Sequence, residues 1–261
     1  MPLSPLQNPE MQILWRHHLR RIFRNLADSW IPGGLSGTGL ITDLYDEAEY
    51  SGCLLDPLYT TQRPWVGMDR SESTVLKARG CLSGRKKPVP LVCVCDIRNP
   101  AFQNRCFDYI LSHSTLDHFD DTGDIGRTVH ELYRILKPGG RLLITLDNPA
   151  NPVVFLRNLL PLPLLRFLGL VPYQIGRTTG RRKLAALLEH ERFSVQQMIF
   201  FDHEPRFITI MLGRWLRAGS GHLLRNAWDR FMRMCESMSR WPTAPLTGYF
   251  YAILAIKSFE P

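Results

Sequence analysis

Short apolar runs, several of them ending in an acidic residue, recur through the first part of the chain and constrain its fold most. They predict strands over residues 39–45, 65–69, 89–96, 107–112 and 141–146. The third run is continuous and rich in valine, which is typical of a strand covered on both faces of its sheet. Helical patterns separate the runs, and alternation of strands with helices favours a mostly parallel α/β sheet.

Helix signals lie between and after these strands. Ser71 or Ser73 predicts a cap for a helix over residues 71–80. Apolar residues three and four apart predict a helix over residues 124–136, and Lys137-Pro-Gly-Gly140 predicts its stop, with a glycine past the helix end. Later patterns predict helices over 182–190, 207–217 and 222–238, and strands over 193–201 and 249–256.

Two segments lie outside this alternation. Residues 11–29 have the spacing of an amphipathic helix, which either packs over the domain or lies on an anionic membrane. Residues 153–173 are very apolar but are broken by prolines, and they form either a cap over the site or a membrane-facing insertion. We therefore expect an N-terminal helix and linker (1–36), a main domain (37–261), an apolar cap (150–182) and a helical insertion (205–245).

The chain carries a net charge of +8 and has a pI of about 9.4, which suits either an anionic partner or a set of solvated basic faces. No run of aromatic residues is interleaved with the basic residues, so nucleic acid is not expected as a partner. The 6 cysteines form no CxxC pair, so no metal site is expected and a reducing compartment is favoured. Neither a signal-peptide pattern nor an uninterrupted run of about 18 apolar residues occurs, which predicts a cytoplasmic protein without a membrane span.

Polar side chains stand at or just beyond the ends of the predicted strands. They are Asp43, Asp69, Asp96, Ser112 and Asp147. Ligands of open parallel sheets bind beyond the carboxyl ends of the strands. Because a charged carboxylate is rarely buried without a partner, the whole set indicates a ligand site, although any single member also suits a helix cap.

Three motifs between Trp65 and Pro149 carry a family resemblance. They are Val66-Gly-Met-Asp-Arg-Ser71, Cys95-Asp-Ile97 with Pro100-Ala-Phe102, and the stretch from Phe107 to His118 followed by Glu131 to Ile144. Together they resemble the class I S-adenosyl-L-methionine (SAM)-dependent methyltransferases, especially the group that includes quinone and sterol methyltransferases. The resemblance implies a doubly wound, mostly parallel seven-stranded sheet of the Rossmann-like methyltransferase kind with a helical, apolar cap, and it implies SAM as cofactor.

The resemblance also assigns roles to residues of these motifs. It implies that Asp69 accepts both ribose hydroxyls of SAM in charge-assisted hydrogen bonds. It implies that Asp96 accepts from the adenine amino group and that Ile97 packs near the ring. Arg70 and Ser112, which belong to the same motifs, are further candidates for cofactor binding.

The glycine-rich GxGxG loop of the family, whose backbone amides approach the methionine carboxylate, is missing after the first strand. Gly37-Thr-Gly39 precedes the apolar run instead of following it, and we interpret it as a false match. We expect the first strand to end at Asp43, with Gly52 further on, and both residues to contact the cofactor.

These features predict SAM-dependent methyl transfer to a small-molecule or lipid-like acceptor, with peripheral membrane contact as a further hypothesis. His113 directly follows the fourth strand and is the first candidate for a catalytic base, ahead of Asp117 and His118. Asp147 and Asn148 either bind the acceptor or hold their loop. Two alternatives stay open: an inactive protein that kept the fold as a binding scaffold, and a nucleotide-dependent oxidoreductase, which should show a glycine-rich fingerprint after its first strand.

Overall fold

The computed structural model describes residues 9–31, 37–49, 64–83, 91–119, 121–161, 164, 178–205 and 222–259. Its first half contains α1 (Pro9–Trp30), β1 (Gly39–Ile41), α2 (Tyr45–Glu49), β2 (Trp65–Asp69), α4 (Glu72–Ser83), β3 (Leu91–Val94), β4 (Phe107–His113), η2 (Leu116–His118) and α5 (Thr122–Ile135). Its second half contains β5 (Leu136–Asp147), α6 (Pro152–Leu159), α8 (Arg181–His190), β6 (Phe193–Phe201), α10 (His222–Glu236), η3 (Ser237–Arg240), α11 (Ala244–Thr247) and β7 (Phe250–Lys257). The predicted helix over 207–217 lies outside the described residues.

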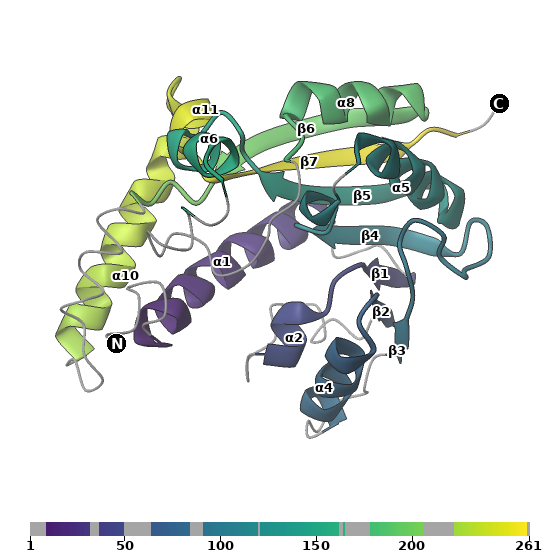
Figure 1. Ribbon diagram of the computed structural model, residues 1–261, viewed down its shortest axis with the longest axis horizontal. Coiled ribbons are helices and arrows are strands. Elements are labelled where there is room, and N and C mark those ends of the chain that lie inside the picture. The colour runs from purple at the N-terminus through teal and green to yellow at the C-terminus, as the bar shows by residue number, and fades with distance from the viewer. Residues whose placement is uncertain are drawn as a thin grey trace.

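The strands form one seven-stranded sheet in the order β3-β2-β1-β4-β5-β7-β6 (Figure 1). The first five strands in that order pair in parallel, and β7 runs antiparallel to both of its neighbours. The order reverses direction at β1 and β4, which makes their carboxyl ends the expected place for a ligand. The predicted doubly wound, mostly parallel α/β fold is confirmed.

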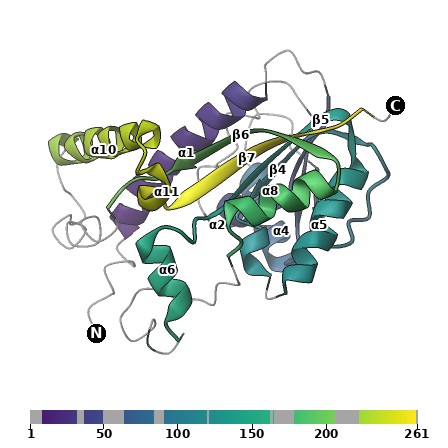
Figure 2. The same cartoon turned by 90° about the horizontal axis from the view of Figure 1, so that it is seen from above.

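Helices cover both faces of this sheet (Figure 2). On one face α5 and α8 bury Ile125, Leu132 and Leu188 against the central strands. On the other face α1 packs Leu19, Phe23 and other apolar residues on β4, β5 and β7. Each fully buried side chain of this size stabilises the fold by about 1.5–3 kcal/mol.

Helix α1 therefore buries its apolar side within the protein. Leu19, Ile22, Phe23, Leu26 and Trp30 are all buried against the sheet. Of the two alternatives for residues 11–29, packing over the domain is the one that the structure shows.

The two largest boundary differences from the sequence prediction lie at the start of β5 and the end of β1. The helix over 124–136 ends at Ile135, and strand β5 begins at Leu136 instead of residue 141. Leu136 has extended backbone and pairs with Phe107, and Pro138 restricts the residue before it to extended conformations. The expected glycine stop therefore lies inside the strand. Likewise β1 ends at Ile41, so Asp43 stands beyond the strand and not within it.

Gly39 is required by close packing at the start of β1. A Cβ atom at this position would overlap the rings of Trp65 and Tyr109, whose centroids lie 4.7 Å apart on the neighbouring strands. Gly37 and Gly39 thus lie at the amino end of β1, opposite the edge where ligands bind. The interpretation of Gly37-Thr-Gly39 as a false match for the glycine-rich loop is confirmed.

We predict that Gly39→Ala destabilises the fold by about 1–3 kcal/mol, because the added methyl group forces two packed rings apart. Gly80→Ala is the matched control: its Cβ meets nothing within 4 Å, and alanine in a helix stabilises by roughly 0.5–1 kcal/mol relative to glycine. Urea unfolding of both variants measures the difference. Equal stability of Gly39→Ala and the native protein would show that the packing at β1 is loose.

Candidate functional site

Three predicted carboxylates gather at the carboxyl edge of strands β1, β2 and β3. Asp69 ends β2, and its carbonyl oxygen accepts from the backbone N–H of Cys95 at 3.0 Å, which places Asp96 just beyond the neighbouring strand. The backbone N–H of Leu44, next to Asp43, donates to Asp69 Oδ2 at 3.2 Å. The structure thus brings Asp43, Asp69 and Asp96 to one edge of the sheet.

Backbone N–H groups hold two of these carboxylates in fixed orientations. Asp69 accepts from Leu44 and, at 2.8 Å, from Ser71, so each of its oxygens has a backbone donor. Asp43 accepts from the N–H of Tyr45 at 2.8 Å. Burial raises the pKa of Asp43 to about 7, and the nearby carboxylates of Asp69 and Asp46 act in the same direction. Negative charge is therefore crowded at this corner.

Asp96 is held by Arg98, its neighbour in the chain. The Arg98 guanidinium contacts both carboxylate oxygens, the shortest distance being 2.6 Å from Nη2 to Oδ2, and also reaches Asp124 on α5 at 2.9 Å. These hydrogen bonds hold the pKa of Asp96 below its usual value, so the carboxylate stays charged. Arg70 is exposed beside it, whereas Ile97 is buried in the main core.

Ser112 and His113 end strand β4 and point to opposite faces of the sheet, as neighbouring strand residues do. Ser112 is fully buried, and within the described part of the chain its Oγ makes no hydrogen bond. His113 Nδ1 lies 2.7 Å from Thr145 Oγ1 on β5, and its ring packs edge-to-face on Phe23 of α1 at a centroid distance of 4.2 Å. Its Nε2 lies 4.0 Å from Asp46.

Asp117, the second candidate base, is buried and contacts the end of β5. Its Oδ2 accepts from the backbone N–H of Asp147 at 2.8 Å, and burial raises its pKa well above the usual value. Asp147 in turn forms a buried ion pair with Arg157 of α6 at 2.6 Å. Asn148 donates to the carbonyl oxygens of Pro245 and Gly248 at 2.7 and 2.8 Å. Asp147 and Asn148 therefore hold their loop, which was one of their two expected roles.

Sequence reasoning missed the cation that reaches this corner. Arg16 of α1 forms an ion pair with Asp46, in the first turn of α2. No motif identifies Arg16, because its partner is brought close only when α1 packs across the sheet. Gly52 lies outside the described residues, as does the side chain of His118.

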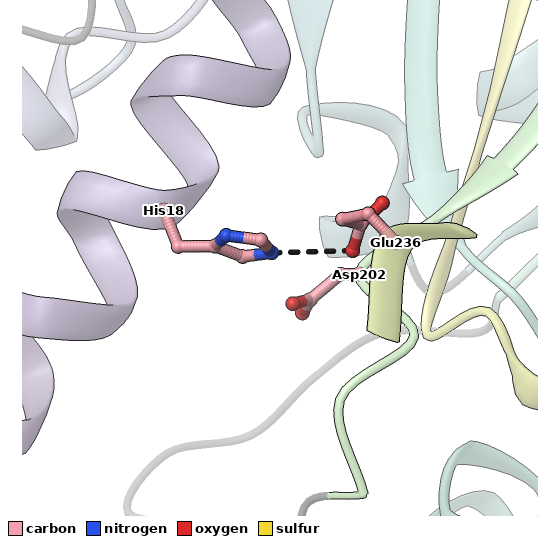
Figure 3. A group of neighbouring side chains, drawn as sticks. All are labelled: His18, Asp202 and Glu236. Atoms are coloured by element: carbon pink, nitrogen blue, oxygen red, sulfur yellow. Dashed lines mark hydrogen bonds and ion pairs between the residues drawn. The ribbon is translucent and has the colours of Figure 1, made fainter. Parts of the chain in front are cut away.

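A second cluster, His18, Asp202 and Glu236, has the residue types of a metal site (Figure 3). His18 Nδ1 accepts a hydrogen bond from Arg21 Nη2 at 2.8 Å, because an arginine can only donate. The hydrogen of the neutral ring therefore sits on Nε2, which donates to Glu236 Oε1 at 3.2 Å. A metal ion would need the lone pair at that nitrogen. The geometry favours a hydrogen-bonded clamp between α1, α10 and the end of β6.

A family model matches the middle of the chain. Residues 50–144 match the family model described as "Methyltransferase domain". Over these residues the chain is similar to methyltransferase domains. This match favours methyl transfer over the oxidoreductase alternative. A search of curated proteins finds no match.

Solved structures share the fold of this methyltransferase domain at low sequence identity. A SAM-dependent methyltransferase from Methanosarcina mazei is 16% identical with a TM-score of 0.57, over 86% of this chain and 94% of that one. Phosphoethanolamine N-methyltransferase 2 from Haemonchus contortus, in complex with SAM, is 18% identical with a TM-score of 0.58, over 90% and 52%. Geranyl diphosphate C-methyltransferase from Streptomyces coelicolor is 13% identical with a TM-score of 0.56, over 92% and 80%.

We predict that Asp43 makes the stability of the ligand-free protein fall as the pH rises. Its raised pKa means that the folded state holds the proton more tightly than the unfolded state. This stabilising contribution is complete below pH 3.8, the ordinary pKa of an aspartate, and it is lost as the pH rises through about 7, the pKa in the folded state. Asp43→Asn lacks it, so melting temperatures of the native protein and this variant should diverge across that window. Parallel curves, matching those of the exposed control Asp28→Asn, would contradict the crowding of charge at the corner.

Proposed function

We propose that the protein transfers the methyl group of SAM to a small, lipid-like acceptor at the carboxyl edge of its sheet. The observation that carries the proposal is the gathering of Asp43, Asp69 and Asp96 at this edge of a methyltransferase fold. The residues fit an adenosine, because fixed carboxylates are suitable acceptors for ribose hydroxyls and for an exocyclic amino group.

In this proposal Asp69 holds the ribose and Asp96 the adenine amino group. The two backbone donors of Asp69 fix the orientation of its carboxylate. Arg98 does the same for Asp96 from the side of α5. Ser112, whose buried hydroxyl has no hydrogen-bond partner within the described residues, is a further candidate at the same edge. Arg70 is exposed beside Asp96, where it flanks the adenine side.

The methionine end of the cofactor meets charged side chains where the family has a glycine-rich loop. The first turn of α2 carries Asp46 and Glu47, and Asp43 precedes it. This acidic corner suits the ammonium group of the cofactor. Arg16 forms an ion pair with Asp46 at this corner, and we assign it to the carboxylate of the cofactor. Helix α1 would thereby contribute to the site from the face opposite α5.

Bound SAM supplies an electrophilic methyl group, and the protein must align an acceptor with it and exclude water. His113 stands at the end of β4 with its ring fixed by Thr145 and Phe23. We assign it the removal of a proton from the acceptor at Nε2, the ring atom on the side of Asp46. Asp117 is too deeply buried to share this role.

The lipid-like class of acceptor is proposed from the surface beside the site. Helix α6 follows β5 at the same edge and exposes Val153, Phe155 and Leu159. Two of the structural neighbours are named for geranyl diphosphate and phosphoethanolamine, a prenyl and a lipid-headgroup compound. Within the described residues no helix is both long enough and apolar enough to cross a bilayer. We propose action in the cytoplasm at the membrane periphery, which also suits the 5 free cysteines of the described chain.

Calorimetric titration with SAM and with S-adenosylhomocysteine tests the proposal. The native protein should bind both, and Asp69→Ala should weaken binding roughly 100-fold through loss of two charge-assisted hydrogen bonds. Asp28→Ala, an exposed acid on α1, should bind as the native protein does. No heat from the native protein with either compound would contradict the proposal and favour a binding scaffold.

A labelled-methyl assay against lipid-linked and prenyl acceptors then separates binding from catalysis. His113→Gln should lower the turnover roughly 100-fold and leave SAM affinity unchanged, because the base acts only in the transfer step. Undiminished turnover would remove His113 from the mechanism without affecting the assignment of Asp69.

A further inference from the structure

Helix α6 buries its charged side chain and exposes apolar ones, which is the reverse of an ordinary surface helix. It buries its single charged residue, Arg157, together with Val154. It exposes Val153, Phe155, Leu156 and Leu159 by 45%, 58%, 48% and 67%. A surface helix of a globular domain normally turns its apolar side to the core and its charges to water. The outward face of α6 is therefore built to contact something apolar.

Buried ionic contacts fix this orientation. Arg157 pairs with Asp147 at 2.6 Å and donates to the hydroxyls of Tyr249 and Thr178 at 3.2 and 3.3 Å. Rolling the helix to hide its apolar face would break a buried ion pair, which is strongly destabilising. A buried ion pair and two hydrogen bonds of Arg157 thus keep the apolar face of α6 outward. Leu246 of α11 is exposed beside it, since Asn151 at the start of α6 donates to the carbonyl oxygen of Leu246 at 3.3 Å.

A cationic turn borders this apolar face. Helix α8 begins with Arg181, Arg182 and Lys183, and its first turn contains no acidic residue. Thr178 accepts a hydrogen bond from Arg157, and Gly180 lies against Pro149, which precedes α6. The first turn of α8 therefore starts close to α6. Figure 2 shows the start of α8 and α6 at the same edge of the sheet. Positive side chains at a helix N-terminus oppose the helix dipole, so their placement costs stability and suits an anionic ligand.

We propose that the outward face of α6 and the first turn of α8 dock on an anionic lipid bilayer. The apolar side chains enter the interfacial region, and Arg182 and Lys183, which are exposed, contact lipid phosphates. A second copy of the chain is disfavoured as occupant because the net charge of +8 makes two copies repel each other. Helix α1, the other amphipathic segment, has its apolar side buried on the sheet and takes no part. The inference is independent of methyl transfer.

Vesicle flotation tests the surface directly. Vesicles of equal parts phosphatidylcholine and phosphatidylglycerol should carry the native protein upward, whereas vesicles of phosphatidylcholine alone should carry at least several-fold less. Phe155→Ser combined with Leu159→Ser should lower the bound fraction at least tenfold. Leu76→Ser combined with Leu91→Ser is the matched control, since these residues are exposed by 57% and 68% on α4 and β3. This control should float as the native protein does.

A charge reversal separates the two components of the surface. Lys183→Glu should weaken binding to anionic vesicles several-fold. Arg24→Glu makes the same change of charge at an exposed position of α1 and should leave binding unchanged. Circular dichroism and SAM titration confirm that each variant is folded.

Three results would overturn the proposal. They are native protein left in the soluble fraction with anionic vesicles, equal flotation of the Phe155/Leu159 variant, or a dimer in sedimentation velocity that this variant abolishes. The last result would assign the face to self-association. None of them bears on cofactor binding, which the titration measures separately.

Discussion

Parallel pairing of β1, β2 and β3 is the constraint on which the site depends. It places Asp43, Asp69 and Asp96 at one edge, where three carboxylates would repel each other in an unstructured chain. Backbone N–H groups compensate for part of this repulsion, and burial, together with the carboxylates of Asp69 and Asp46, raises the pKa of Asp43. Such crowding of like charges costs stability, and in our proposal a ligand that supplies donors and positive charge offsets this cost.

Three arginines, from α1, from α6 and from the loop after β3, form ion pairs with acids around this edge. Arg98 bridges Asp96 to α5, Arg16 brings α1 to α2, and Arg157 fastens α6 to the end of β5. Each contact also fixes the position of a helix relative to the sheet. The Arg157–Asp147 pair thus also fixes which surface of α6 faces outward, whereas apolar packing on the sheet fixes the orientation of α1. This coupling links the proposed cofactor site to the proposed membrane surface at one edge of the molecule.

Much of the fold was predictable from the sequence because its signals are local. The apolar runs before Asp69 and Asp96 and the periodic helix ending at Ile135 are strong patterns, and Ser71 caps α4 as expected, accepting from the N–H of Thr74 at 3.3 Å. The predicted start of β5 was wrong. Pro138 and the pairing of Leu136 with Phe107 keep the backbone extended where the glycines had indicated a helix stop. Arg16 and Arg157 were missed because each pairs with an acid on a different element, α2 and β5 respectively. Local spacing carries no information about which acid an arginine meets once the helices have packed.

The most direct test of the central claim is a crystal structure of the protein with S-adenosylhomocysteine. The account predicts one adenosine between β2 and β3, with its ribose hydroxyls on the carboxylate of Asp69 and its amino group on that of Asp96. An adenosine bound elsewhere, with both of these carboxylates still facing only protein groups and water, would contradict it.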